Sequence, residues 1–209
     1  MGAPMEFEAY LDALASADPT PGGGSAATLV GALAAALCAM VARITLAAPK
    51  LVSLHEEAAA IVEDADELRA RFVELRPVDE AAFRAVVDAQ ALPRATDAER
   101  TVRTTMIQAA LIGAAEAPLE AARLATDAFA LTSRTAELRN ANLMSDVACA
   151  LHFARAAFDA SAANVEVNHH YIKDTATIAQ QRERLATLAR AAREFESRTA
   201  TIVGGRRDR

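Results

Sequence analysis

Apolar residues recur at helical spacing along almost the whole chain. A short run over residues 6–16 predicts a first helix, because its apolar positions fall on one helical face. Further helices are predicted over residues 25–47, 50–76, 78–92, 96–131, 133–140, 145–168 and 174–198. Residues 199–209 are expected to form a loose tail, since they end in glycine and arginine. The pattern predicts an all-α protein, with a single up-and-down helical domain of six to eight helices over residues 1–209.

Prolines and glycines divide this pattern. The strongest break is the segment Asp18 to Gly24, after which Ser25 is expected to cap a long alanine-rich helix. Pro77 is expected to close one helix, and Pro118 to kink or divide another. Gly31 stands in a row of small residues at every fourth position, which predicts a second helix packed unusually close.

Composition supports helices and narrows the functional classes. Alanine fills 54 of 209 positions and aromatic residues only 4%, which suits packed helices better than sheets. The net charge is −6, and the sequence contains no basic face of the kind that binds nucleic acid. The apolar run 26–42 is short and mostly alanine, so a buried central helix is expected rather than a membrane span. With no signal-peptide pattern, the protein is expected to be cytoplasmic.

Metal and thiol chemistry find little support in the sequence. Cys38 and Cys149 lie far apart in apolar runs, which is typical of reduced core thiols. None of the four histidines has a partner at zinc-ligand spacing, so no metal site is predicted.

Three polar clusters are candidates for chemistry. In the first, Gly22, Gly23, Gly24 and Ser25 form a glycine turn before a helix start, which is either purely structural or a cradle for an anionic group. The second cluster is rich in amides and also carries hydroxyl and carboxylate groups. It consists of Asn140, Asn142, Ser145, Asp146, Asn164 and Asn168.

The spacing within the second cluster limits what one ligand can reach. Asn164 and Asn168 are four residues apart and share a helix face. Asp146 points the same way but lies roughly 27 Å from Asn164 along a straight helix. Only an extended ligand or a groove between two subunits would be lined by both ends. Helix caps and buried amide networks are the structural alternative.

The third candidate is Asp79, in the segment Val78 to Phe83. Taken alone, Asp79 and Glu80 are ordinary acidic residues of a helix start, where they complement the helix dipole.

Read in order, these segments resemble the cyclodeaminase/cyclohydrolase family of tetrahydrofolate enzymes. The resemblance spans residues 6–190 and rests on an ordered set of motifs. These are Pro19-Thr20-Pro21-Gly22-Gly23-Gly24-Ser25 with its alanine-rich helix, Asp79-x-x-Ala82-Phe83, Leu92-Pro93, Arg103 with Gln108, Ala117-Pro118-Leu119, Asn140-x-Asn142-x-x-Ser145-Asp146, Asn164-Val165, Asn168 and Asp174.

The resemblance implies an all-helical homodimer whose sites lie in a groove between subunits. It implies a folate substrate with no metal and no redox cofactor, while the net charge and the short apolar run predict no nucleic-acid or membrane partner. The implied acid/base is Asp79, with Asp146 as a supporting carboxylate. The implied substrate-binding residues are Gly22, Gly23, Gly24, Ser25, Lys50, Arg94, Arg103, Asn140, Asn142, Ser145, Asn164 and Asn168.

Three activities remain open on this basis. The leading one is methenyltetrahydrofolate cyclohydrolase, which opens the cyclic cation with water to give 10-formyltetrahydrofolate. Formiminotetrahydrofolate cyclodeaminase, which releases ammonia, is the first alternative, and a non-catalytic folate-binding or interaction module is the second.

The chain also departs from the family pattern. Arg94 stands where members carry lysine, and arginine does not readily donate a proton. In the segment Ala47 to Leu51 only Lys50 remains of a basic cluster. Arg139 replaces a glycine, and His169 and His170 replace apolar or small residues.

Overall fold

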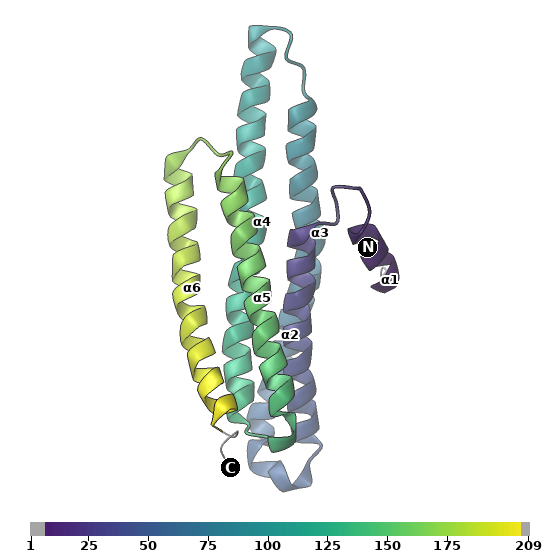
Figure 1. Cartoon of the computed structure of the whole chain (residues 1–209), viewed down its shortest axis with the longest axis vertical. Coiled ribbons are helices and arrows are strands. Elements are labelled where there is room, and N and C mark those ends of the chain that lie inside the picture. The colour runs from purple at the N-terminus through teal and green to yellow at the C-terminus, as the bar shows by residue number, and fades with distance from the viewer. Residues whose placement is uncertain (1–6, 206–209) are drawn as a thin grey trace.

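A computed structural model describes residues 7–205 of the chain. Within this range the fold has six α-helices, two short 3₁₀ helices and no strand, which confirms the all-α prediction (Figure 1). The elements are α1 (Phe7–Leu14), α2 (Gly23–Leu46), η1 (Pro49–Leu54), α3 (His55–Ala91), α4 (Asp97–Glu137), η2 (Ala141–Leu143), α5 (Met144–His169) and α6 (Thr175–Gly204).

The bundle has two levels along its long axis. Helices α3 and α4, of 37 and 41 residues, form the longest antiparallel pair and project beyond the start of α2 and the end of α5 (Figure 1). The opposite end carries η1 and η2, together with the C-terminal end of α6 (Figure 1). The projecting pair therefore leaves a step on the bundle, at the level where α2 begins.

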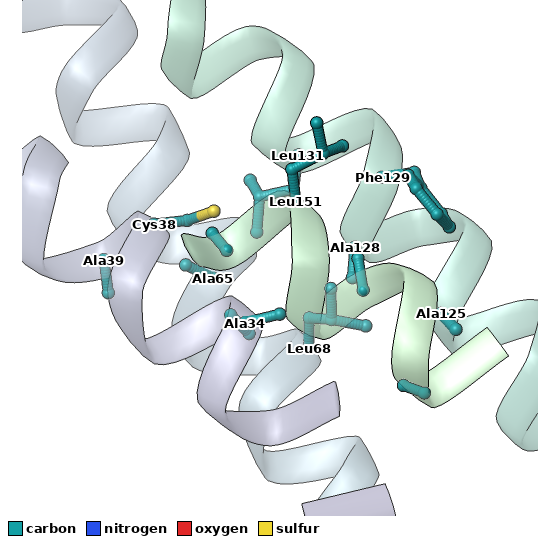
Figure 2. Close-up of a cluster of buried hydrophobic side chains, with 14 of the residues drawn as sticks. Ala34, Cys38, Ala39, Ala65, Leu68, Ala125, Ala128, Phe129, Leu131 and Leu151 are labelled. Atoms are coloured by element: carbon teal, nitrogen blue, oxygen red, sulfur yellow. The ribbon is translucent and has the colours of Figure 1, made fainter. Parts of the chain in front are cut away.

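Helix α2 is the central helix that the apolar run predicts. Length and composition alone would also allow it to cross a membrane, but it packs against α3, α4 and α5 inside the bundle. Its small residues Ala27, Ala35 and Ala39 are almost completely buried, as the predicted ridge requires. Figure 2 shows how such alanines and Cys38 pack against leucines and Phe129 from neighbouring helices.

Pro77 does not end a helix, contrary to the sequence expectation. The segments 50–76 and 78–92 are instead largely one helix, α3, with Pro77 inside it. Proline cannot donate to the carbonyl four residues earlier, here that of Val73. Because Val73 is 53% exposed, water can satisfy that carbonyl, and the helix continues.

Pro118 also lies within a continuous helix. Helix α4 runs through it to Glu137, and the segment 133–140, expected to be separate, supplies its last turn. The carbonyl that Pro118 leaves free belongs to Ala114, and it accepts a hydrogen bond of 3.3 Å from the Asn168 side chain. A side chain from α5 thus replaces the missing helix bond.

The C-terminal tail is shorter than expected. Helix α6 continues to Gly204, and Thr199 is completely buried. Thr199 donates to the carbonyl of Phe195. The expected loose segment 199–209 is therefore helical over its first part, and residues 206–209 lie outside the described range.

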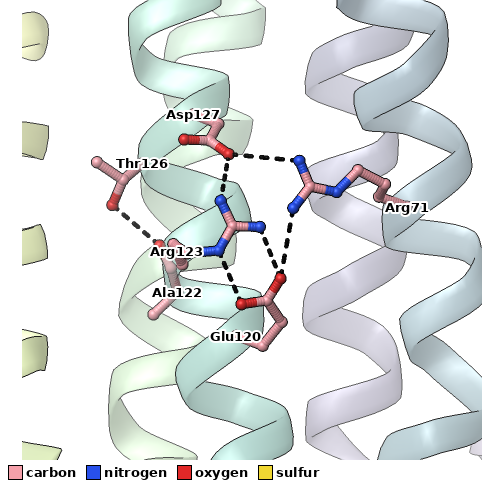
Figure 3. A network of polar contacts seen from close by, with 6 residues as sticks. All are labelled: Arg71, Glu120, Ala122, Arg123, Thr126 and Asp127. Carbon is pink, nitrogen blue, oxygen red and sulfur yellow. Dashed lines mark hydrogen bonds and ion pairs between the residues drawn. The ribbon is translucent and has the colours of Figure 1, made fainter.

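Ion pairs connect α3 and α4 on the outer side of the bundle. Arg123 contacts Glu120 at 2.6 Å and Asp127 at 2.7 Å, and Arg71 reaches the same two carboxylates from α3 (Figure 3). The Arg123 hydrogen bond holds the pKa of Glu120 below its usual value. These pairs are partly exposed, so they align the two helices more than they stabilise them.

Candidate active site

A cavity of about 500 Å³ lies at the step of the bundle, within the range typical of small-molecule sites. Its walls come from the loop before α2, the first turn of α2, the second half of α3, the middle of α4 and the end of α5. The lining is mainly apolar, with a few convergent polar groups. The lining includes Gly22, Gly23, Gly24, Asp79, Glu80, Phe83, Gln90, Gln108, Pro118, Asn164, Asn168 and Tyr171.

Asp79 lies against the start of α2. A Cβ placed on Gly24 would come to 2.4 Å from its Oδ2, so only glycine allows the carboxylate this position. The pKa of Asp79 is raised, first by burial and second by the negative charge of Glu80. A carboxyl with a raised pKa in a cavity is a candidate to accept and return a proton during a reaction.

Ser25 does not have the predicted role. Helix α2 begins at Gly23, its N-cap is Gly22, and no side chain caps it. Ser25 is fully buried behind the cavity wall, where its hydroxyl lies 3.1 Å from the Tyr10 hydroxyl and donates to Glu80 at 3.3 Å. Of the four residues of the predicted cradle, Gly22, Gly23 and Gly24 line the cavity and Ser25 does not.

Asn164 and Asn168 line the cavity together, in agreement with their predicted common face. Asn168 donates through Nδ2 to the carbonyls of Asn164 at 3.0 Å and of Ala114 at 3.3 Å. Both amide hydrogens of Asn168 are thereby engaged, so its oxygen is the group left for a ligand. Asn164 donates to the Ala160 carbonyl at 2.8 Å and keeps its oxygen and one hydrogen.

The projecting end of the cavity carries polar and basic groups. Arg103 donates twice to the carbonyl of Gln90, a lining residue, at 2.9 and 3.1 Å. Gln108 joins α4 to the turn after α5, since it donates to the Tyr171 carbonyl and accepts from the Lys173 amide. Arg94 lies farther out, in the turn between α3 and α4.

The structure does not bring the remaining predicted residues to this cavity. Lys50 lies in η1, Asn140 and Asn142 lie at η2, and Ser145 and Asp146 lie in the first turn of α5. They gather at the opposite end of α2 and α5, where Asn140 donates to the Thr45 hydroxyl at 3.3 Å. Asp146 therefore does not support Asp79 within one subunit.

Among the lining residues that were not predicted site residues, four carry polar or aromatic groups of interest: Glu80, Phe83, Gln108 and Tyr171. Glu80 carried a signal, because two successive acids on one helix are 100° apart and both can face one cavity. Phe83 and Gln108 stand within the motifs that carry the resemblance. Tyr171 follows a helix end, and no sequence pattern marked it.

Among residues 7–205, no group of three or more His, Cys, Asp or Glu side chains is placed to hold a metal ion. Proton transfer and charge stabilisation are what the side chains of the cavity can provide.

Comparison with known proteins decides the family. The sequence matches the family model described as formiminotransferase-cyclodeaminase over residues 6–187. The chain belongs to the formiminotransferase-cyclodeaminase family. The family assignment agrees with the resemblance carried by the motifs.

Relatives in this family differ in their named activities. The chain is 36% identical to a methenyltetrahydrofolate cyclohydrolase of Methylorubrum extorquens, covering 94% of this chain and 95% of the relative. It is 26% identical to the formimidoyltransferase-cyclodeaminase of Rattus norvegicus, where it matches only 36% of that longer protein.

A solved structure supports the fold. The formiminotetrahydrofolate cyclodeaminase of Thermotoga maritima superposes with a TM-score of 0.86 at 29% identity, covering 95% of this chain and 96% of that one. The family member described here thus keeps the fold over nearly its whole length.

Proposed function

We propose that this protein is a methenyltetrahydrofolate cyclohydrolase, with Asp79 as its general acid/base. The observation that carries the assignment is a partly buried carboxyl, with a raised pKa, in a cavity of suitable size. The full-length relative named as a cyclohydrolase supports this activity over ammonia release.

The proposed reaction needs both protonation states of Asp79. Water adds to the methenyl carbon of the cationic substrate, and the carboxylate of Asp79 takes a proton from it. The bond from that carbon to N5 then breaks, and Asp79 returns the proton to N5. The added hydroxyl loses its own proton as the formyl C=O forms, so one proton is released overall. A carboxylate beside the cation also stabilises the charge before water attacks.

The remaining lining groups divide the substrate between them. The free oxygen of Asn168 accepts a hydrogen bond from an N–H of the pterin, because both of its own hydrogens are engaged. Gly22, Gly23 and Gly24 let the substrate approach the backbone beside Asp79. Arg103 and Arg94, at the projecting end, lie where they can meet the carboxylates of the glutamate tail.

We also propose that the protein is a homodimer that pairs through α2 and α5. These helices pack against each other, and α2 keeps an outward apolar stripe at alternating spacings of three and four residues. The stripe consists of Val30, Leu33, Leu37, Met40 and Ile44, of which Leu33 is 45% and Ile44 44% exposed. The outer face of α5 carries exposed small residues at seven-residue spacing, Cys149, Ala156 and Ala163, with His152 and Asp159 exposed beside them, so a second copy can approach along the small residues.

A two-fold axis across the middle of α5 would complete the site. It would place Asp146 of the partner subunit opposite Asn164, because the two positions are related by reversal of the helix. The amides of the second polar cluster would then line the same groove as Asp79. This arrangement supplies a role for Lys50, Asn140, Asn142, Ser145 and Asp146, which do not line the cavity of Asp79 within one subunit.

The activity is tested by following the loss of methenyltetrahydrofolate absorbance, with the buffer-catalysed rate subtracted. We expect acceleration that falls at least 100-fold in Asp79→Asn, and no comparable loss in Asp88→Asn. Asp88 is an exposed carboxylate on the same helix, outside the cavity, so it controls for a general charge effect. Full turnover by Asp79→Asn would contradict the assignment.

The shared site is tested by mixing inactive variants. If each site combines Asp79 of one subunit with Asp146 of the other, mixed dimers of Asp79→Asn and Asp146→Asn contain one intact site. Activity should return to about a quarter of the wild-type value after subunit exchange, because half the dimers are mixed. No recovery in dimers shown to have exchanged would exclude the shared site.

Formiminotetrahydrofolate cyclodeaminase is the second candidate, favoured by the Thermotoga maritima structure. Ammonia release from formiminotetrahydrofolate, with no acceleration of methenyl hydrolysis, would select it. Either reaction is proposed to use no metal or cofactor, since carboxyl and amide groups suffice for the proton transfers, and to take place in the cytoplasm.

A further inference from the structure

Glu80 has no role in the reaction described so far, although it lines the cavity beside Asp79. A chain of hydrogen bonds from two other helices holds it. The Ser25 hydroxyl donates to Glu80 at 3.3 Å, and the Tyr10 hydroxyl lies 3.1 Å from Ser25. Because the single hydrogen of Ser25 points to Glu80, the Tyr10 hydroxyl donates to Ser25.

The two hydroxyl-bearing residues are fixed in place. Tyr10 is 4% exposed and Ser25 is completely buried. The guanidinium of Arg76 lies 5.6 Å from the centre of the Tyr10 ring and keeps α1 against α3. The chain therefore leads from α1 through α2 to the carboxylate of Glu80 on α3, which accepts the hydrogen bond of Ser25.

Few other charges reach Asp79. From α2 the start of the helix at Gly24 lies against it, and from α5 the neutral amides of Asn164 and Asn168 line the same cavity. The described lining residues of α4 are uncharged, and the turn after α5 contributes the phenol of Tyr171. Arg76, one turn before Glu80 on α3, is directed at the Tyr10 ring. Among the described lining residues, Glu80 is thus the one acidic side chain besides Asp79.

We propose that Glu80 is a positioning residue for catalysis: held by Ser25 and Tyr10, its negative charge keeps a proton on Asp79 available for transfer to the folate. Two carboxylates that face one cavity do not ionise together at low cost, so fixing one as the anion favours the protonated form of the other. The proposal rests on the proposed function, because it needs Asp79 as the acid/base. The raised pKa of Asp79, caused by burial and then by Glu80, agrees with it.

The test is the pH profile of kcat/KM in Glu80→Gln, which removes the charge and keeps the shape. Without Glu80 the pKa of Asp79 should fall, so the profile limb that reports Asp79 should move to lower pH by about one unit. Ser25→Ala and Tyr10→Phe should move it the same way by less, because they loosen Glu80 without removing it. Asp88→Asn, which removes an equal charge from α3 outside the cavity, should leave the limb in place. Glu80→Asp keeps the negative charge on a shorter side chain, so its limb should lie between those of the wild type and Glu80→Gln.

A second readout separates this proposal from the proposed function. The carboxyl carbon of Asp79, identified by its loss in Asp79→Asn, is titrated by NMR in the substrate-free protein. A lower Asp79 pKa in Glu80→Gln supports the coupling. An unchanged pKa and limb, with kcat reduced equally at every pH, would make Glu80 merely structural and overturn the proposal. Full activity of Asp79→Asn would instead overturn the proposed function.

Discussion

Two contacts between α2 and α3 each place a side chain of α3 directly against a glycine of α2, with opposite effects on stability. A Cβ placed on Gly31 would lie 2.4 Å from the Phe72 ring, and one placed on Gly24 would lie 2.4 Å from the Asp79 carboxylate. Both pairs are separated by seven residues on each helix, so the contacts repeat along one antiparallel seam. The backbone of α2 thus approaches α3 closely at both places. The side chain from α3 decides whether the contact belongs to the hydrophobic core, as with Phe72, or to the cavity, as with Asp79.

The two contacts contribute to folding stability with opposite sign. Phe72 is completely buried, and removing a phenylalanine from water stabilises a fold by about 1.5–3 kcal/mol. Asp79 is held partly out of water, which raises its pKa and so disfavours the charged form. The first contact stabilises the bundle, whereas the second disfavours the charged carboxyl and so opposes folding at neutral pH.

Gly24→Ala should show the largest effect, because it should reduce activity strongly while leaving stability almost unchanged. The new methyl group must displace the Asp79 carboxylate, which can turn toward the cavity without disturbing the core. We expect kcat/KM to fall about 100-fold, equivalent to about 2.7 kcal/mol of transition-state stabilisation. Circular dichroism should show a melting temperature within about 2 °C of the wild type.

The matched control is Gly23→Ala, one position earlier. A Cβ on Gly23 would meet only the Asn164 amide, at an ordinary 3.7 Å. Its loss in kcat/KM should be smaller than about fivefold. Equal losses in the two variants would mean that any side chain in this turn blocks the site, and that the Asp79 contact is not special.

Gly31→Ala should damage the fold instead. Three atoms of the Phe72 ring would lie within 3.0 Å of the new methyl group, and the ring has no free space. Overpacking of this kind costs about 1–3 kcal/mol, only partly offset by the better helix propensity of alanine. We expect urea unfolding to show a loss of about 1–2 kcal/mol, with activity retained at low temperature.

Gly113→Ala is the control for propensity, because nothing lies within 4 Å of a Cβ at that exposed position of α4. It should stabilise the protein by about 0.5–1 kcal/mol. Adding Phe72→Leu to Gly31→Ala should recover part of the lost stability. Simple additivity of the two changes would contradict the packing explanation.

Pro118→Ala extends the comparison to the opposite wall of the cavity. Alanine would supply the backbone N–H that proline lacks and would compete with Asn168 for the Ala114 carbonyl. Asn168 would then lose its fixed orientation, and KM for the folate should rise about fivefold, or about 1 kcal/mol, while thermal stability stays equal or rises. Pro77→Ala, in the exposed helix segment, should leave KM unchanged. An unchanged KM in Pro118→Ala would show that Asn168 needs no help from this carbonyl.

The helices and the close ridge of α2 followed from local pattern, because period and small residues are visible in the chain itself. The two proline errors had another cause: whether a proline breaks a helix depends on what satisfies the freed carbonyl. For Pro77 that is solvent beside Val73, and for Pro118 it is an α5 side chain 50 residues later. Neither is visible from the proline's own neighbours.

The candidate site was only partly predictable, because some of its residues follow from local spacing and others depend on contacts between distant segments. Asn164 and Asn168 share a helix face by spacing alone, and both reach the cavity. Asp79 came from the family resemblance, since its own segment looks like an ordinary helix turn. Asp146 was placed by motif order, which says nothing about which subunit it serves. Ser25 was misassigned because a serine after glycines looks like a cap, whereas its hydroxyl belongs to Glu80.

The smallest predicted effect tests directly whether the ionised Asp79 carboxylate lowers the stability of the folded protein. The folded protein raises the pKa of Asp79 above its unfolded value, so ionising this group costs folding stability once the pH exceeds the unfolded pKa. Asp79→Asn, which removes that charge, should therefore raise the melting temperature by about 1–2 °C at neutral pH, a small amount because the site is partly solvated. The gain should disappear below about pH 4, where the wild-type carboxyl is protonated in both states. Asp88→Asn, on the exposed face of α3, should show no such pH-dependent gain. A stability loss in Asp79→Asn at neutral pH would mean that the first turn of α2 stabilises the carboxylate more than burial and Glu80 oppose it, and that the two glycine contacts have the same sign.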